Sequence, residues 1–193
     1  LMVSKAGNTG NEPYDSIGVF DGITIFSQGK MKYNSKLLRE SIVFKTDEPY
    51  SDISRSITLK QLNRLQSFDY PTIKYQYANE DETLLDASIF LMPKKQYSLD
   101  FALDVTQSNI LKRGIAFSSG LSVLNVFKGA ETLELGARGS FGRSADVAIS
   151  EYGFDVQLRA PQFLLPFKSE INNQKLAPLT ILRVGVGSQE NIG

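Results

Sequence analysis

The second half of the chain is constrained above all by a regular alternation of apolar and polar residues. Five consecutive segments of roughly 7–11 residues repeat with a period of two, the spacing of side chains that share one face of a β-strand. Their apolar positions are Tyr97, Leu99, Phe101, Leu103 and Val105; Ile115, Phe117, Leu121 and Val123; Leu133, Leu135, Ala137 and Phe141; Tyr152, Phe154, Val156, Leu158 and Ala160; and Leu182, Val184 and Val186. The alternation predicts five strands, each with one apolar face.

Two environments could accept such a face. In a soluble sandwich or barrel it packs inward, whereas in an outer-membrane barrel it meets lipid and the polar face lines a wet lumen. Several segments approach the length of about 9–11 residues that a tilted strand needs to cross a bilayer. Tyr97 and Tyr152 begin two segments, where an aromatic girdle would lie. The polar positions mix small residues with charges, namely Asp100, Asp104, Glu134, Arg138, Asp155, Arg159 and Arg183. These features favour the membrane barrel, while a soluble β-domain stays open.

Composition excludes several classes of function. The chain contains no His and no Cys, which excludes a Ser-His-Asp triad, a thiolate nucleophile and the usual zinc sites. The 21 Lys and Arg residues balance the 21 Asp and Glu residues, so the basic excess that nucleic-acid binding needs is missing. Both ends of the sequence look arbitrary, and we expect the chain to be an internal piece of a longer protein.

The first half begins with a strand pattern followed by a short helix. A β-rich run over residues 17–25 contains an Asp-Gly turn, which predicts a strand or a hairpin. Asn34 or Ser35 can cap the helix that follows. The expected buried positions of that helix are Leu37, Leu38, Ser41 and Ile42.

A second helix and two strands complete the first half. Ser51 is a good N-cap, and Asp52 in the first turn suits the helix dipole. The expected apolar stripe of this helix, which runs to about residue 67, is Ile53, Ile57, Leu62 and Leu65. We expect a strand after Pro71, a turn at Asn79–Glu82, and a further strand that Pro93 ends. The predicted order is therefore β-α-α-β-β.

This order resembles the BamA/TamA family of outer-membrane assembly proteins, in which POTRA modules precede a C-terminal barrel. Four stretches carry the resemblance: Leu37–Lys45 with Pro49–Ser51, Thr58–Ile73, Asn125–Glu131, and Pro161–Phe167. The last two are most similar to the TamA-like branch and its lipoprotein variant, TamL. Two features of the family are absent, namely its VRGF loop motif and its terminal aromatic residue. The sequence Arg138-Gly139-Ser140-Phe141 is only superficially similar to that motif, because it lies within a predicted strand and not in a loop.

The resemblance implies a fold and a division of the chain. The fold class is an α+β POTRA module (β-α-α-β-β) over residues 14–95, followed over residues 96–193 by about the first five antiparallel strands of a transmembrane β-barrel. It further implies a bacterial outer-membrane protein with its POTRA part in the periplasm. The expected partners are client outer-membrane or translocated polypeptides, the lipid bilayer and a periplasm-spanning protein of the TamB type.

The function implied is protein assembly or translocation without enzymatic activity and without a cofactor or metal. A two-partner secretion translocator, a passive pore and a soluble β-domain with a binding role remain alternatives. The candidate client-pairing edge is the first barrel strand: Tyr97, Ser98, Leu99, Asp100, Phe101, Ala102, Leu103, Asp104, Val105 and Thr106. The candidate POTRA edge is Thr72, Ile73, Lys74, Tyr75, Gln76 and Tyr77.

Charged residues on the strands have a structural interpretation. Asp100 and Asp104 share one face, as a glycosidase pair would, but lumen charges explain them better. Glu134 with Arg138 and Asp155 with Arg159 also share faces, and we expect these groups to form ion pairs between strands.

Overall fold

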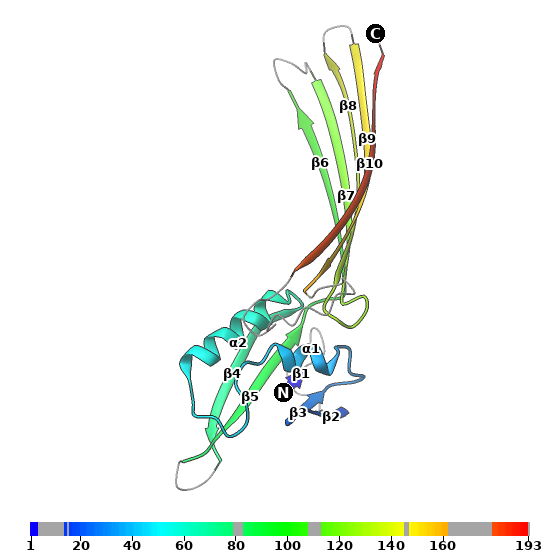
Figure 1. Cartoon of the computed structure of the whole chain (residues 1–193). Helices are drawn as coiled ribbons and strands as arrows, with labels where there is room; N and C mark the ends of the chain where they lie inside the picture. The colour runs from blue at the N-terminus through cyan, green and yellow to red at the C-terminus, as the bar shows by residue number, and fades with distance from the viewer. Residues whose placement is uncertain are drawn as a thin grey trace. The chain divides into compact units, whose positions relative to one another are not determined.

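The computed structural model describes residues 1–3, 14, 16–78, 83–107, 113–144, 147–161 and 179–192. It divides into two compact units (Figure 1). The first comprises Leu1–Lys95, Asn125–Glu131 and Ala160–Thr180, and the second comprises Gln96–Leu124, Thr132–Arg159 and Ile181–Gly193. The predicted turn at Asn79–Glu82 and the stretch from Gln162 to Phe167 lie outside the described residues.

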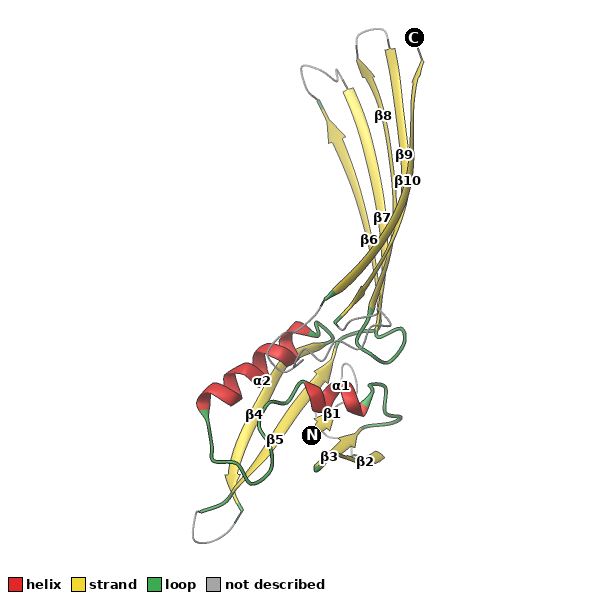
Figure 2. Cartoon of the chain, in the orientation of Figure 1, coloured by secondary structure: helices red, strands yellow, loops and turns green. Residues whose placement is uncertain are grey.

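The first unit is a mixed five-stranded sheet with two helices, shown in red in Figure 2. Its strand order is β2-β3-β1-β5-β4. The strands are β1 (Met2–Val3), β2 (Ser16–Phe20), β3 (Ile23–Ser27), β4 (Phe68–Tyr77) and β5 (Leu85–Pro93). The helices are α1 (Ser35–Glu40) and α2 (Asp52–Arg64). None of the helices in the described part of the chain has the length and apolar character needed to span a membrane.

Local sequence explains where both helices begin. The Asn34 side chain accepts a hydrogen bond from the Lys36 backbone N–H at the start of α1. The Ser51 side chain accepts one from the Ser54 N–H at the start of α2. Each cap satisfies a backbone donor that the helix leaves without a partner. Both predicted caps are confirmed.

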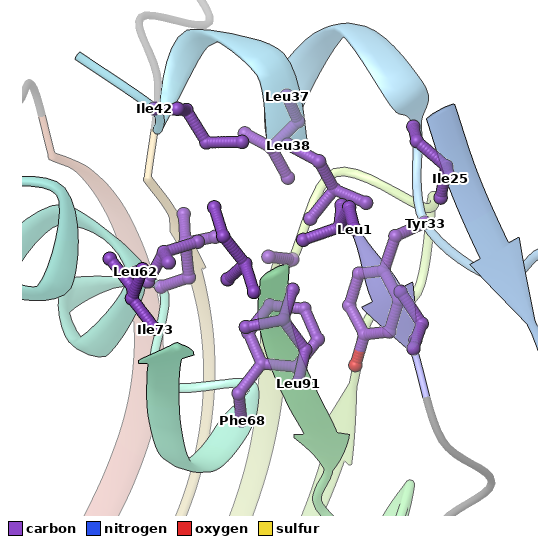
Figure 3. Close-up of a cluster of buried hydrophobic side chains, with 14 residues drawn as sticks. Leu1, Ile25, Tyr33, Leu37, Leu38, Ile42, Leu62, Phe68, Ile73 and Leu91 are labelled. Atoms are coloured by element: carbon purple, nitrogen blue, oxygen red, sulfur yellow. The ribbon is translucent and has the colours of Figure 1, made fainter. Parts of the chain in front are cut away.

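The core of the first unit draws on the sheet and both helices (Figure 3). Leu38 of α1 and Leu62 of α2 are completely buried, and Leu91 of β5 is almost so. The remaining buried members of this cluster are Leu1, Val3, Ile25, Tyr33, Leu37, Ile42, Leu65, Phe68, Ile73, Ile89 and Ala130. The predicted core positions Leu37, Leu38, Ile42, Leu62 and Leu65 are therefore confirmed.

Strand β1 corrects the predicted β-α-α-β-β order. It pairs in parallel with β3 through Met2↔Phe26 and with β5 through Met2↔Phe90, so it lies in the middle of the sheet. Residues 17–25 were predicted to form a strand or a hairpin. They form a hairpin, in which β2 pairs with β3. A two-residue strand is too short to show a period, which is why the sequence pattern does not reveal β1.

The buried face of α2 also differs from the predicted stripe. Ile53 is 73% exposed and Ile57 is 38% exposed, whereas Thr58 is completely buried. Leu62 follows Ile53 by nine residues, or about two and a half helical turns, so the two side chains lie on opposite faces. Thr58, Leu62 and Leu65 share the inner face, and the polar Thr58 was missed because it interrupts the apolar pattern.

Strand β4 begins earlier than Pro71. It starts at Phe68, and the register with β5 shifts between Asp69 and Thr72. Tyr70, inside this irregularity, has a φ of 44°. Proline is tolerated at a bulge on an edge strand, so Pro71 does not mark the start of the strand.

A distant segment completes the first unit. The turn at Asn125–Glu131 hydrogen-bonds residues before α1, since the Asn34 N–H donates to the Lys128 carbonyl at 2.8 Å and the Asn125 side-chain amide donates to the Lys32 carbonyl at 2.9 Å. Ala130 is 2% exposed within the core cluster. The first unit therefore has a discontinuous sequence.

The second unit is a five-stranded sheet of order β10-β9-β8-β7-β6. The strands are β6 (Tyr97–Thr106), β7 (Arg113–Leu124), β8 (Thr132–Ser144), β9 (Val147–Ala160) and β10 (Thr180–Ile192). The pairs β6–β7, β7–β8 and β8–β9 are antiparallel without a register shift in the described ladders. Each of the five alternating segments lies within one strand, so the predicted strands are confirmed.

Candidate functional site

Strand β6 forms one edge of the second sheet. It pairs with β7 at ten positions, from Tyr97↔Val123 to Thr106↔Gly114, and no other strand in the described part of the chain pairs with it. All ten residues of the predicted client-pairing edge therefore lie together on one edge strand. Such an edge presents backbone N–H and C=O groups that another strand can pair with. Pairing with a client stays a prediction.

One face of the second sheet is apolar and uncovered. Phe101 of β6 is 75% exposed, Phe154 of β9 is 58% exposed and Val184 of β10 is 72% exposed. The register places the apolar positions of β6 to β9 side by side, as in the row Leu99–Leu121–Leu135–Val156. A soluble sheet would cover such a face with a second layer, and within the described residues none covers it.

The height of this apolar face is comparable to that of the apolar band of an outer-membrane barrel. Its rows run from Tyr97↔Val123 to Val105↔Ile115, a separation of eight residues along β6. Eight residues span about 27 Å of extended strand, or about 20 Å along the membrane normal at the tilt usual in barrels. Outer-membrane barrels carry an apolar band of about 25 Å.

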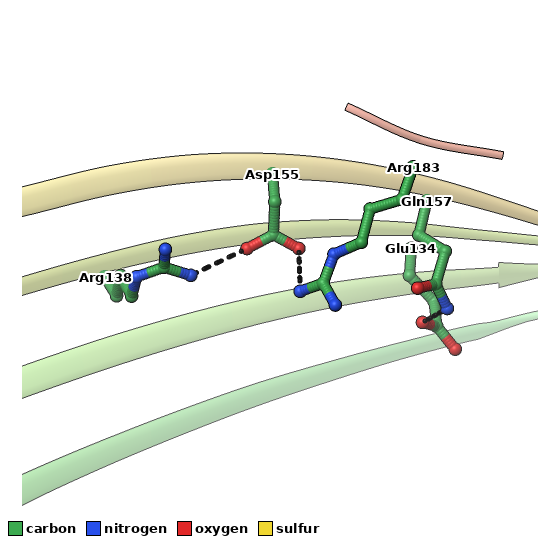
Figure 4. A network of polar contacts seen from close by, with 5 residues as sticks. All are labelled: Glu134, Arg138, Asp155, Gln157 and Arg183. Atoms are coloured by element: carbon green, nitrogen blue, oxygen red, sulfur yellow. Dashed lines mark hydrogen bonds and ion pairs between the residues drawn. The ribbon is translucent and has the colours of Figure 1, made fainter. Parts of the chain in front are cut away.

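The opposite face carries a network of polar side chains (Figure 4). The Asp155 carboxylate of β9 accepts from Arg138 Nη1 of β8 at 3.2 Å and from Arg183 Nη2 of β10 at 3.3 Å. The Gln157 side-chain amide donates to Glu134 Oε2 at 2.9 Å. The predicted ion pairing between strands is confirmed for Arg138 and Asp155, and Arg183 joins them. Glu134 instead bonds the neutral Gln157 amide, so an ion pair of Glu134 or Arg159 stays a prediction.

Two glycines make room for this network, and sequence reasoning missed both. A Cβ at Gly136 would lie 3.0 Å from Asp155 Oδ1, and one at Gly153 would lie 3.2 Å from Arg138 Nε. Both glycines lie on the polar face, opposite Asp155 and Arg138 respectively in the ladder. The sequence does contain a signal for these two glycines, because small residues alternate with charged residues on the polar positions of the strands.

The polar face also contains a hollow of about 430 Å³. Polar side chains, including Asp104, Ser118, Arg138, Glu151 and Gln189, contribute to its lining. No group of three or more acidic side chains that could hold a metal ion occurs in the described part of the chain. The arrangement suits hydration of this face.

Strand β4 forms an edge of the first sheet, and the predicted edge residues Thr72–Tyr77 occupy its second half. Tyr75 packs edge-to-face against Tyr50 at a centroid distance of 5.0 Å. Burial raises the pKa of Tyr75. The Tyr50 hydroxyl donates to Asp52 Oδ1 at 2.6 Å, and this hydrogen bond is the main cause of its raised pKa. Both phenols therefore stay neutral at physiological pH, and the pairing role of β4 stays a prediction.

The chain is similar to solved structures rather than to a known sequence family. No family model matches it, and no curated protein matches it. Among solved structures it is similar to the crystal structure of BamA from Haemophilus ducreyi lacking POTRA domains 1-3, at 11% sequence identity and a TM-score of 0.40. The match covers 88% of this chain and 38% of that chain, so this chain spans well under half of that chain's length.

Proposed function

We propose that this chain belongs to a bacterial outer-membrane protein that assembles or translocates other polypeptides without an enzymatic step. The observation that carries the proposal is the second sheet, which combines an open edge strand with an uncovered apolar face and a charged opposite face. The motif resemblance to the BamA/TamA family supports the same function. In this proposal the apolar face meets lipid and the first unit is a POTRA module in the periplasm.

The proposed mechanism is strand templating at β6. A client strand that pairs with the outer edge of β6 would gain backbone hydrogen bonds while its own apolar face enters lipid. Each such bond stabilises by about 0.5–1.5 kcal/mol in water, and unpaired groups cost several kcal/mol in lipid, so pairing drives insertion. No bond is made or broken covalently, and no cofactor is needed.

Strand β4 offers a second pairing edge in the same proposal. Tyr75 lies on this strand with Tyr50 packed against it, and the exposed Ile53 and Ile57 of α2 add apolar surface to the first unit. An extended client segment with alternating apolar residues would suit this edge. A partner of the TamB type, which spans the periplasm, belongs to the same set of expected partners.

Site-specific photo-cross-linking tests the templating role. A benzoylphenylalanine at Phe101 on β6 in the full-length membrane protein should form adducts with other polypeptides during outer-membrane biogenesis. The matched control is Leu135, which lies on the same apolar face but on the central strand β8. Adducts at position 101 and not at 135 support the proposal. Equal adducts at both positions, or adducts at neither, would favour a passive pore.

A further inference from the structure

Two arginines stand directly opposite each other at one end of the apolar face. Arg113 begins β7 and pairs with Arg143 of β8 in the antiparallel ladder, and both side chains are exposed. Residues 115, 117, 141 and 143 alternate with the polar-face positions, so the arginines project from the same face as Ile115 and Phe141. Ala148 lies opposite Arg143 on β9 and leaves space beside it.

This arrangement needs a negatively charged partner. Side chains directly opposite in an antiparallel ladder have Cβ atoms about 4.5–5.5 Å apart, and like charges at that spacing destabilise the sheet. The ion pairs found among the described residues involve Arg39, Arg138, Arg183 and Lys36, and neither Arg113 nor Arg143 takes part in one. An anion placed between the two guanidinium groups would remove the repulsion.

The position of Arg113 and Arg143 relative to the apolar rows of the sheet indicates which kind of anion binds them. The arginines follow the Ile115↔Phe141 row by two residues, or about 7 Å of strand. Phe117 and Phe141 stack on the apolar side of the pair, at a centroid distance of 6.2 Å. Since the apolar face meets hydrocarbon, the next row of side chains reaches the level of the lipid headgroups. Arginine binds phosphate oxygens in a planar, bidentate manner.

We infer that Arg113 and Arg143 together bind the anionic phosphate headgroup of a membrane lipid. This inference rests on the proposed membrane location of the sheet. One phosphate bridges the two guanidinium groups on the outside of β7 and β8. The site fixes a lipid beside the sheet and stabilises the end of the β7–β8 ladder.

Native mass spectrometry of the full-length protein in a non-ionic detergent tests the site. Phosphatidylglycerol and the zwitterionic phosphatidylcholine are titrated in separate series. The double variant Arg113→Gln/Arg143→Gln should bind phosphatidylglycerol about twenty-five-fold more weakly, because each arginine at a membrane surface contributes about a factor of five. The charge-matched control Arg138→Gln/Arg183→Gln, on the polar face, should bind it as the wild type does.

A stability measurement provides an independent readout. In detergent without anionic lipid, Arg143→Gln alone should raise the melting temperature, since it removes the like-charge contact. Phosphatidylglycerol should then stabilise the wild type and not this variant.

Three results would overturn the inference. They are unchanged phosphatidylglycerol binding in the double variant, an equal loss in the polar-face control, and displacement of the lipid by inorganic phosphate at equal concentration. Failure of the wild type to insert into lipid vesicles would instead count against the proposed function. The two failures are distinguishable, because the titration in detergent measures lipid binding at Arg113 and Arg143 without requiring insertion.

Discussion

Thr58 shows how a single polar residue can be essential to an apolar face. It is completely buried on α2, and its hydroxyl oxygen accepts from the Val43 backbone N–H at 3.1 Å. Thr58→Val keeps the shape but leaves that donor unpaired, so the first unit should lose about 1–3 kcal/mol of stability. The neighbouring Ile57→Val, at a more exposed position, should cost under about 0.5 kcal/mol. Urea unfolding of the first unit, followed by hydrogen exchange, measures both changes, and an equal effect would contradict the assigned face.

Tyr33 predicts how the first unit responds to alkaline pH. Burial raises the pKa of this phenol from 10.0 to about 12, and its hydroxyl donates to the Ser67 carbonyl at 3.4 Å. Above pH 10 the unfolded chain releases this proton while the folded chain keeps it. Stability should therefore fall between pH 10 and about 12, by roughly 2 to 3 kcal/mol at the upper end. Denaturant unfolding across this range checks the slope, with Tyr33→Phe as the control in which this contribution disappears.

At single residues, the sequence predicts burial well where apolar residues keep a helical period, and poorly where an apolar residue lies off that period or a polar residue occupies it. Leu38 and Leu62 were placed correctly because they follow a helical period. Ile53 is apolar but lies on the outer face of α2, whereas Thr58 is polar and lies on the inner face, so side-chain polarity alone predicts both positions wrongly. The roles of Gly136 and Gly153 depend on partners across the sheet, which a single strand pattern cannot show.

The turn at Asn125–Glu131 is the element whose stability is easiest to test. Glu131 is 4% exposed, and its Oε2 accepts from the backbone N–H groups of Phe127 at 3.2 Å and Gly129 at 2.9 Å. Asn125, Lys128 and Ala130 all have positive φ angles, so these hydrogen bonds hold a strained backbone.

Replacing Glu131 should therefore loosen the first unit. Glu131→Ala leaves two amides unpaired and should cost about 2–4 kcal/mol. Glu131→Gln keeps an oxygen acceptor and should cost about 1 kcal/mol. Hydrogen exchange at Phe127 and Gly129 reports the difference, and similar protection in both variants and the wild type would contradict the role given to the carboxylate.

Among the elements, strands β6 to β10 could be predicted because each contains an alternation of apolar and polar residues that continues over several positions. Strand β1 could not, because two residues carry no period and both of its ladders join distant parts of the chain. The participation of residues 125–131 in the first unit is likewise a long-range effect. The stretch Asn125–Glu131 carries part of the family resemblance, but the resemblance does not indicate which residues this turn contacts.

For the whole molecule, the two edge strands were predicted as candidate sites, and each lies at the edge of its sheet. Whether a strand lies at an edge depends on the order of strands in the sheet. The family resemblance implied that order, whereas the residue pattern of a single strand does not contain it. The arginine pair on β7 and β8 went unnoticed because Arg113 and Arg143 are far apart in sequence and meet only through the register.

The central claim is that the apolar face of the second unit meets lipid while the opposite face meets water. The chain has no cysteine, so single cysteines can be introduced and spin-labelled without background. Nitroxides at positions 99, 101 and 103 of the full-length protein in bilayers should be relaxed strongly by oxygen and weakly by a water-soluble nickel chelate. Nitroxides at positions 100, 102 and 104 should show the reverse. Protection of 99, 101 and 103 from both relaxants would instead place that face in a protein core and contradict the membrane account.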